Sequence, residues 1–358
     1  MKTSKKHIYL TAFLPIQVIL LKLAANNPQF IEYYYSNGIY PFISSFLRIA
    51  LGWIPFSVGD ILLILSLFVF LKFIYTLISN KFIHFIPKII HFTATLSIIY
   101  FCFYFFWGLN YYRNPLAKNL NYPQSEYKTE QLKKVTEHII KKLNEYQFKI
   151  TKNDTLKVNN PYSQKEMYVM AIDGYNNLSK DFPQLEYKHA SIKNSFISLL
   201  QSYNGTAGYL NPLTGEAQIN DKIPKTSYPT TTCHEMAHQL GFAAENEANF
   251  IGFLAANYHE NNYFKYASYR MAFGYCISEI KRRDVEISKE LWKTVNLGIT
   301  KDFNASYEFW QEYKNPLEPL IKKGYNTYLK ANKQSKGVDS YNYVVDLLIS
   351  YFETLNKI

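Results

Sequence analysis

Three long apolar stretches dominate the first third of the chain. They cover residues 8–25, 58–78 and 89–109, and each comes close to the ~20 residues that a helix needs to cross the hydrocarbon core of a bilayer. A cleaved signal peptide is the alternative for the first stretch, but that stretch lacks a clean small-x-small cleavage site and two more apolar stretches follow. We therefore expect residues 1–113 to form a membrane anchor with three transmembrane helices.

A shorter apolar segment lies between the first two of these stretches. Residues 41–55 are interrupted by Arg48 and bounded by prolines, which predicts a short helix that lies in the bilayer interface or packs on the bundle. Asp60 follows at the start of the second stretch. We expect its carboxylate either to pair with Arg48 or to cap the second helix.

Residues 114–358 predict a mostly helical second domain. Residues 127–146 carry apolar side chains at helical spacing, and residues 164–178 are another helix candidate. Turn signals such as Asn204-Gly205 and Thr214-Gly215 break this pattern and predict a β-hairpin or small sheet over residues 195–220. Helical patterns return after Pro229, so the fold class that we predict is mainly α.

The chain is basic, with 39 Lys and Arg against 28 Asp and Glu and a formal net charge of +11. The lysines are scattered and form no dense run, so we expect no binding to nucleic acid. Lysines precede the first span and flank the loop before the third, which places the N-terminus in the cytoplasm by the positive-inside rule. Three spans then place the C-terminal domain outside the inner membrane of a bacterium, in the periplasm or extracytoplasmic space.

Three cysteines are too few for a disulfide framework, and no CxxC motif is present. The sequence leaves open whether Cys233 and Cys276 form a single disulfide bond. Cys233 adjoins the candidate metal site described next, but its helical direction lies ~100° from that of His234. We expect a buried structural cysteine there rather than a fourth ligand.

The sequence His234-Glu235-Met236-Ala237-His238 is an HExxH motif. Two histidines at i and i+4 lie on one helical face, where both imidazoles can reach one Zn²⁺, and the intervening glutamate lies beside the metal without having to bind it. Pro229 offers a helix start and Gly241 a helix stop, so the motif is expected on a short helix. A chance match on a surface helix is the alternative.

A zinc site of this kind needs a third protein ligand. Glu245 and Glu247 follow the bend at Gly241, but residues two apart on a helix point ~200° apart, so only one of them can face the metal. We predict Glu245 as the ligand and keep Glu247 as the alternative. Asn249 shares a face with Glu245 and is expected to accept the Nδ1–H of a ligating histidine.

These residues predict metal-assisted hydrolysis. Zinc would lower the pKa of a bound water toward ~7, and Glu235 would take the proton and deliver it to the leaving amine. Tyr341 and His259 are candidate donors to the oxyanion, although either is also compatible with a packed or surface residue. The segment 216–220 is expected to be a strand whose edge could pair with an extended peptide, or else an ordinary hairpin strand.

The motif and its surroundings resemble known families. HExxH followed by Glu245 and Asn249 is similar to the gluzincin class of zinc peptidases. Over nearly the whole chain, five segments resemble the bacterial membrane family described as domain of unknown function 3810, which implies a multi-pass anchor and a zincin-like domain. These segments are residues 33–38, 55–60, 107–111, 208–212 and 233–239.

We therefore expect a membrane-anchored zinc metallopeptidase whose partners are the lipid bilayer and a peptide or protein substrate. A catalytically inactive zincin-fold scaffold is one alternative, because Asn249 stands where gluzincins often carry aspartate; the intact Glu235 argues against it. A transport-related protein is another, but three spans are few and ionisable residues within them are nearly absent. The sequence identifies neither the substrate nor the oligomeric state.

Overall fold

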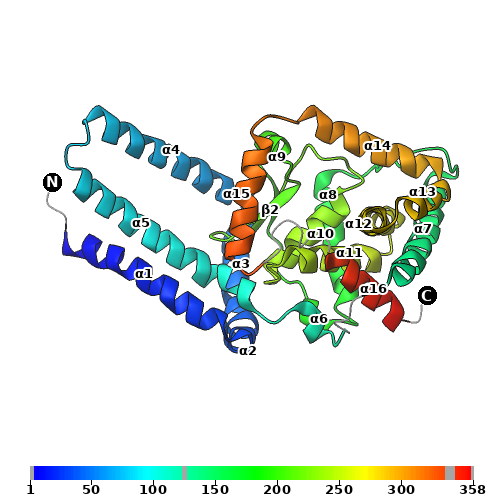
Figure 1. The fold of residues 1–358 in the computed structure, drawn as a ribbon, viewed down its shortest axis with the longest axis horizontal. Coiled ribbons are helices and arrows are strands. Elements are labelled where there is room, and N and C mark those ends of the chain that lie inside the picture. Colours follow the sequence, from blue (N-terminus) through cyan, green and yellow to red (C-terminus); the bar gives the residue numbers. More distant parts are fainter. Residues whose placement is uncertain (1–3, 123–126, 335–342, 356–358) are drawn as a thin grey trace.

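The computed structural model describes residues 4–122, 127–334 and 343–355. Long helices project to one side of a larger helical body (Figure 1). Three of them, α1 (Lys5–Ala25), α4 (Val58–Ser79) and α5 (Phe85–Phe106), are long and apolar enough to cross a membrane. This confirms the three predicted apolar spans, with the third beginning four residues earlier than expected.

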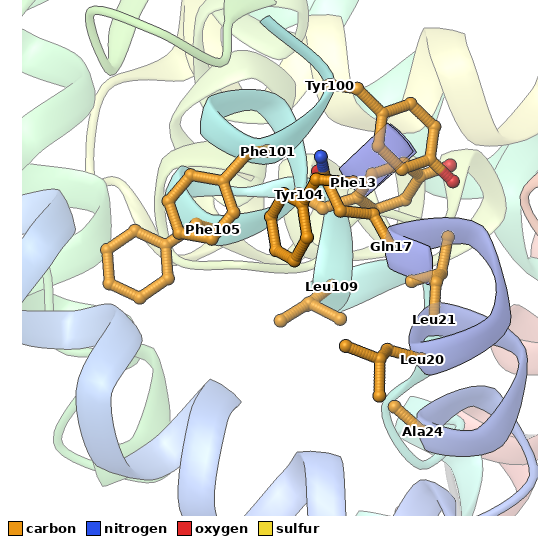
Figure 2. A pocket seen from close by; sticks show the side chains of 10 residues that line it. All are labelled: Phe13, Gln17, Leu20, Leu21, Ala24, Tyr100, Phe101, Tyr104, Phe105 and Leu109. Carbon is orange, nitrogen blue, oxygen red and sulfur yellow. The ribbon is translucent and has the colours of Figure 1, made fainter. Parts of the chain in front are cut away.

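Helices α1 and α5 pack against each other, and polar side chains meet at their contact. Gln17 Nε2 donates to Ser97 Oγ at 2.8 Å, and the Thr11 and Thr93 hydroxyls lie 3.0 Å apart. A hollow of about 230 Å³ opens beside Gln17 and is otherwise lined by apolar and aromatic side chains of the two helices and Leu109 (Figure 2). Interhelical hydrogen bonds of this kind are typical of helices packed within a bilayer.

A compact segment joins α1 to α4. It comprises α2 (Pro28–Phe30), the π-helix η1 (Ile31–Ile39) and α3 (Tyr40–Gly52). Helix α3 confirms the short helix predicted within residues 41–55. Both expectations for Asp60 are wrong: the Ser57 hydroxyl caps α4, whereas Asp60 Oδ2 accepts from Phe196 N at 2.7 Å and from Ser195 Oγ at 3.0 Å.

The larger body is built mainly of helices around one apolar core. The helix predicted within residues 127–146 is α7, and residues 164–178 form α8 as expected. The helices are η2 (Gly108–Tyr112), α6 (Leu116–Asn119), α7 (Thr129–Thr151), α8 (Gln164–Leu178), η3 (Pro183–Leu185), α9 (Ser198–Asn204), α10 (Tyr228–Gln239), α11 (Glu245–Tyr258), α12 (Asn262–Arg283), α13 (Val285–Lys293), α14 (Leu297–Glu312), α15 (Glu318–Ala331) and α16 (Val344–Thr354).

The predicted small sheet is present and has three strands. Strands β1 (Ile192–Asn194) and β2 (Gly208–Asn211) flank β3 (Glu216–Ile219), which pairs parallel with β1 and antiparallel with β2. The expectation that the strand at residues 216–220 offers a free edge is therefore wrong. It is the central strand, and all four of its residues are buried. The edge position beside the HExxH helix belongs to β2.

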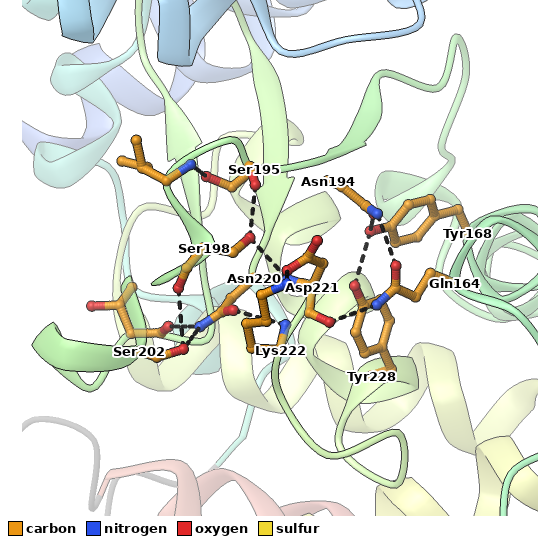
Figure 3. A network of polar contacts seen from close by, with 12 residues as sticks. Gln164, Tyr168, Asn194, Ser195, Ser198, Ser202, Asn220, Asp221, Lys222 and Tyr228 are labelled. Atoms are coloured by element: carbon orange, nitrogen blue, oxygen red, sulfur yellow. Dashed lines mark hydrogen bonds and ion pairs between the residues drawn. The ribbon is translucent and has the colours of Figure 1, made fainter. Parts of the chain in front are cut away.

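A polar network holds the sheet against α8 and the first residue of α10 (Figure 3). Tyr168 of α8 donates to Asn194 at the end of β1, and its hydroxyl lies 3.3 Å from that of Tyr228. Gln164 accepts from Asn194 Nδ2 and donates to the carbonyl of Asp221, both at 2.8 Å. These bonds fix where the HExxH helix starts relative to the sheet.

Candidate metal centre

Helix α10 carries the HExxH motif and is almost entirely buried. Pro229 stands in its first turn, where a missing N–H costs nothing, and the helix ends just before Gly241. Gly241 has φ +89°, and a Cβ there would meet the ring of Tyr40 at 2.8 Å, so this turn requires glycine. The predicted start and stop of the motif helix are both confirmed.

The turn at Gly241 brings the start of α11 back beside the two histidines. Glu245 Oε2 lies 3.3 Å from His234 Nε2 and 3.7 Å from His238 Nε2. The ligand atoms of His234, Glu235 and His238 also lie within 4.8 Å of one another. The structure therefore brings together the side chains that the sequence indicated as two histidine ligands, a carboxylate ligand and a neighbouring acid.

Glu247 lies elsewhere, although it is only two residues from Glu245. Its Oε1 accepts from Leu116 N at 2.6 Å. Burial raises the pKa of this carboxyl to about 7, while the Leu116 N–H and Arg113 oppose the rise. The geometry thus favours Glu245 over Glu247, as the angular argument predicted.

Glu235 is buried beside the histidine pair. Among the residues that the structure describes, nothing hydrogen-bonds to its Oε2. Burial raises the pKa of its carboxyl, and the two histidines oppose that rise. A Cβ at Gly208 of β2 would meet Glu235 Oε1 at 2.8 Å, so the strand backbone approaches the acid closely. A buried carboxylate with a free oxygen is suited to exchanging a proton.

His238 and Glu245 shift each other's pKa at the centre. Burial by itself would lower the pKa of His238, but the Glu245 carboxylate outweighs it and raises that pKa to about 9. Burial would raise the pKa of Glu245, yet hydrogen bonds from His234 and His238 hold it well below its usual range. The cluster therefore keeps Glu245 ionised at neutral pH and His238 protonated in the absence of a metal.

The Nδ1 atoms of His234 and His238 do not make the predicted contact with Asn249. His238 Nδ1 lies 2.7 Å from the carbonyl oxygen of Phe242, a contact that the tight turn at Gly241 creates. Among the described residues, neither His234 Nδ1 nor Asn249 Nδ2 has a hydrogen-bond partner. The expected bond between Asn249 and a ligating histidine is therefore wrong: the Phe242 carbonyl contacts His238 Nδ1, and Asn249 does not reach His234 Nδ1.

One of the two candidate oxyanion donors, His259, does not join the site. His259 is at the opposite end of α11, and the 14 residues of that helix span roughly 20 Å. Its Nδ1 accepts from Asn261 N at 2.8 Å and its ring stacks on Phe264, so it is a packed residue. Tyr341 lies outside the described residues.

A tyrosine that the sequence analysis missed does reach the centre. Tyr325 of α15 donates from its hydroxyl to Glu245 Oε1 at 2.7 Å. It lies 80 residues along the chain from its partner, in a helix without a recognisable motif. No local pattern pointed to it.

The N-terminal segment caps the end of the motif helix. Tyr40 and Ser44 donate to the carbonyl of Gln239 at 2.9 and 2.8 Å, and Trp107 Nε1 donates to that of His238 at 2.9 Å. Arg113 donates to the carbonyl of Gly241 at 3.1 Å. The last carbonyls of a helix have no partners within it, so these contacts hold the ends of α3 and α5 against the site.

The cysteines contribute no ligand and no cross-link. Cys102, Cys233 and Cys276 are all free, so the pairing of Cys233 with Cys276 that the sequence left open does not form. Cys233 and Cys276 are part of the apolar core, and burial raises the pKa of both thiols. Cys233 is the buried structural cysteine that its helical direction predicted.

The chemistry of the donor set fits a zinc ion. Two ligands about 2.1 Å from a tetrahedral zinc lie roughly 3.4 Å apart. The separations of 3.3 and 3.7 Å between Glu245 Oε2 and the two Nε2 atoms are close to that value. The contact from His238 Nδ1 to Phe242 O turns Nε2 toward Glu245, as a ligating histidine requires.

Fold and site together define a mainly helical protein with three candidate membrane spans and a buried histidine–glutamate cluster on its motif helix. A family model described as "Protein of unknown function (DUF3810)" matches residues 35–349, and the chain belongs to that family. The matched residues include the helices α4 and α5, the three-stranded sheet and the motif helix α10. No curated protein and no solved structure matches the chain.

Proposed function

We propose that this protein is a membrane-anchored zinc-dependent hydrolase that cleaves peptide bonds. One observation carries the proposal: the Nε2 atoms of His234 and His238 converge on one oxygen of Glu245 at 3.3 and 3.7 Å, with the buried Glu235 beside them. The basic residues that flank the spans support an N-terminus in the cytoplasm and a hydrolase body on the other side of the membrane.

Each side chain then has a distinct task. His234, His238 and Glu245 would hold the zinc, which when bound supplies a Lewis acid and lowers the pKa of a coordinated water. Glu235 takes a proton from the attacking water through its free Oε2 and passes it to the leaving amine. Tyr325 holds Glu245 through Oε1, so that Oε2 stays turned toward the histidines.

A peptide is the substrate class that the sheet supports. Within the described sheet β2 is an edge strand, and its first residue, Gly208, lies against Glu235. An extended peptide can add to such an edge through main-chain hydrogen bonds. Its scissile bond would then lie next to the acid that moves the proton.

Metal content of the full chain tests the ligand set. We expect Glu245→Gln to lose zinc, because the third ligand is removed. Glu247→Gln is the matched control: it changes a buried glutamate two residues away that contacts Leu116 N, and it should keep one zinc per chain. Elemental analysis of the purified variants checks this. One zinc per chain retained in both variants would rule out Glu245 as a ligand.

Hydrolysis of a peptide library tests the catalytic role of Glu235. Glu235→Gln should retain zinc and lose about 10²–10⁴-fold in turnover, the usual contribution of a general base. Unchanged turnover with full zinc would show that Glu235 is not the base. Zinc binding by a wild-type chain that cleaves nothing in the library would instead favour the inactive scaffold.

A further inference from the structure

Helix α3 turns a row of large apolar side chains outward. Its buried face carries Tyr40, Ser44 and Arg48, which contact the body. The opposite face exposes four residues spaced at i, i+4, i+7 and i+11, with Phe42 79% and Trp53 78% exposed: Phe42, Phe46, Ile49 and Trp53. A stripe at this spacing is the apolar face of an amphipathic helix, and the part of the chain that the structure describes leaves it exposed.

Helix α9 has the inverse of the usual pattern for a soluble protein. Its buried side chains are polar: Ser198, Gln201 and Ser202. Its exposed apolar side chains are Leu199, Leu200 and Tyr203, and Phe196 in the turn just before the helix is exposed as well. In water this arrangement is unfavourable, so the outer face of α9 is built for an apolar environment.

Helix α15 is the third element with an open apolar face. Leu317, Leu320 and Ile321 are exposed, and within the helix only Leu329 is buried. Three lysines, Lys322, Lys323 and Lys330, lie exposed along the same helix. In Figure 1, α15 runs across the ends of α4 and α5 rather than along them. Apolar residues interleaved with lysines are typical of helices that lie on a bilayer surface.

Contacts join the faces of α9 and α15 to the membrane spans, and α3 is connected to α4 by the short link of residues 53–57. The rings of Phe56 and Phe196 stack 6.3 Å apart, directly before α4 and α9. Asp60, in the first turn of α4, accepts from Phe196 N at 2.7 Å. At the other end, Tyr104 of α5 donates to Asn332 just after α15 at 2.9 Å. The faces therefore lie level with the ends of the spans.

We propose that the outward faces of α3, α9 and α15 form a bilayer-docking surface that rests on an anionic lipid membrane. The surface continues from the candidate spans α4 and α5, and the lysines of α15 match the charge of acidic headgroups. Transfer of these apolar faces from water to the acyl boundary of the bilayer lowers the free energy of the protein. This inference concerns how the body is seated and holds whether or not the metal centre is catalytic.

The same surface places the metal centre at the membrane. Tyr325 of α15 contacts Glu245, and Trp107, directly after α5, contacts the carbonyl of His238. Single side chains, those of Tyr325 and Trp107, therefore connect the candidate ligands to α15 and to the end of α5, which contact lipid in this proposal.

Fluorescent labels on the full chain test the docking surface. In a Cys102→Ser background, single cysteines replace Phe46, Leu200 and Leu320, and Val169, which is 64% exposed on α8, provides the control. Cys233 and Cys276 are fully buried and stay unlabelled. Each protein is labelled with an environment-sensitive dye and placed in phosphatidylcholine–phosphatidylglycerol vesicles whose acyl chains carry bromine near the headgroup.

We expect blue-shifted emission and loss of fluorescence by bromine at Phe46, Leu200 and Leu320, and neither effect at Val169. Three positions on three elements keep the test valid if one variant does not fold. Labels no more quenched than the control would overturn the proposal. Shielding without bromine quenching, dependent on the protein-to-lipid ratio, would also overturn it and assign the surface to a second copy of the chain. The measurement requires no metal and no hydrolysis.

Discussion

At the scale of single residues, the position of one carboxylate controls the candidate centre. Glu245 lies within 3.7 Å of both histidine Nε2 atoms, whereas Glu247 binds the backbone of Leu116. Both are buried, but burial raises the pKa of Glu247 and the histidines lower that of Glu245. Neighbours rather than burial alone therefore decide which acid is charged and free to bind a metal.

The raised pKa of His238 predicts how zinc affinity depends on pH. Below its pKa of about 9, the metal-free imidazole holds a proton that zinc has to displace. Apparent affinity should therefore rise with pH, by up to about tenfold per pH unit, and level off above that pKa. Competition with a chromophoric chelator at several pH values measures this.

Proton release provides the check on that prediction. Calorimetry at pH 7 in buffers of different ionisation enthalpy should show about one proton released per zinc bound. A zinc affinity independent of pH between neutral and alkaline solution, with no proton released, would contradict the charge assignment at His238.

At the scale of elements, strand β2 approaches helix α10 closely at a glycine, with only the side chain of Glu235 between their backbones. Gly208 lies so close that a Cβ there would be 2.8 Å from Glu235 Oε1 and 3.0 Å from its Cγ. The closest contact is with the flexible side chain of Glu235, and the backbone carbonyl oxygen of Gln218 also lies only 3.1 Å from the same Cβ. An added methyl group therefore displaces the candidate base and crowds β3. The cost would appear in the position of the candidate base.

Gly208→Ala is therefore expected to reduce turnover and, because the added Cβ also crowds the Gln218 carbonyl, to lower the melting temperature somewhat. A displacement of the base by about 1 Å can cost about 10²-fold in rate. Zinc content should stay at the wild-type level. Gly274→Ala is the control, because a Cβ there meets Phe303 only at ordinary contact distance, 3.6 Å. Turnover, zinc content and melting temperature are compared, and equal turnover in both variants would show that β2 does not constrain Glu235.

At the scale of the whole molecule, the N-terminal segment is part of the framework of the site. Glu216 of β3 accepts from Val58 N and Gly59 N at 3.2 and 2.5 Å, at the start of α4, and pairs with the buried Lys193. Tyr40 and Ser44 satisfy the carbonyl of Gln239 at the end of the motif helix. The predicted domain boundary at residue 113 therefore separates buried hydrogen-bonding groups of the body from their partners in the N-terminal segment.

A fragment of residues 114–358 should lose cooperative folding and zinc binding. Each buried polar group left without its partner costs about 1–3 kcal/mol, and a domain has a net stability of only about 5–15 kcal/mol. Circular dichroism melting and zinc content of the fragment and of the full chain measure this. Cooperative unfolding together with one bound zinc in the fragment would show that the body folds without its anchor.

Periodic patterns along the sequence predicted the elements and part of the site. Long apolar runs indicated α1, α4 and α5, helical spacing indicated α7 and α8, and the HExxH spacing placed His234 and His238 on one face of α10. These features depend on residues within a few turns of one another. The angular argument also favoured Glu245 over Glu247, because both lie on the same short helix.

Only the tertiary structure decided the contacts between distant segments. It placed Tyr325 on Glu245, put β2 rather than β3 at the sheet edge, and replaced Asn249 with the Phe242 carbonyl at His238. Each of these depends on how two elements pack, and no local periodicity encodes that packing. The sequence alone determined the spans and the motif helix, because backbone hydrogen bonding and amphipathic patterning are short-range. The surroundings of the centre follow from long-range packing.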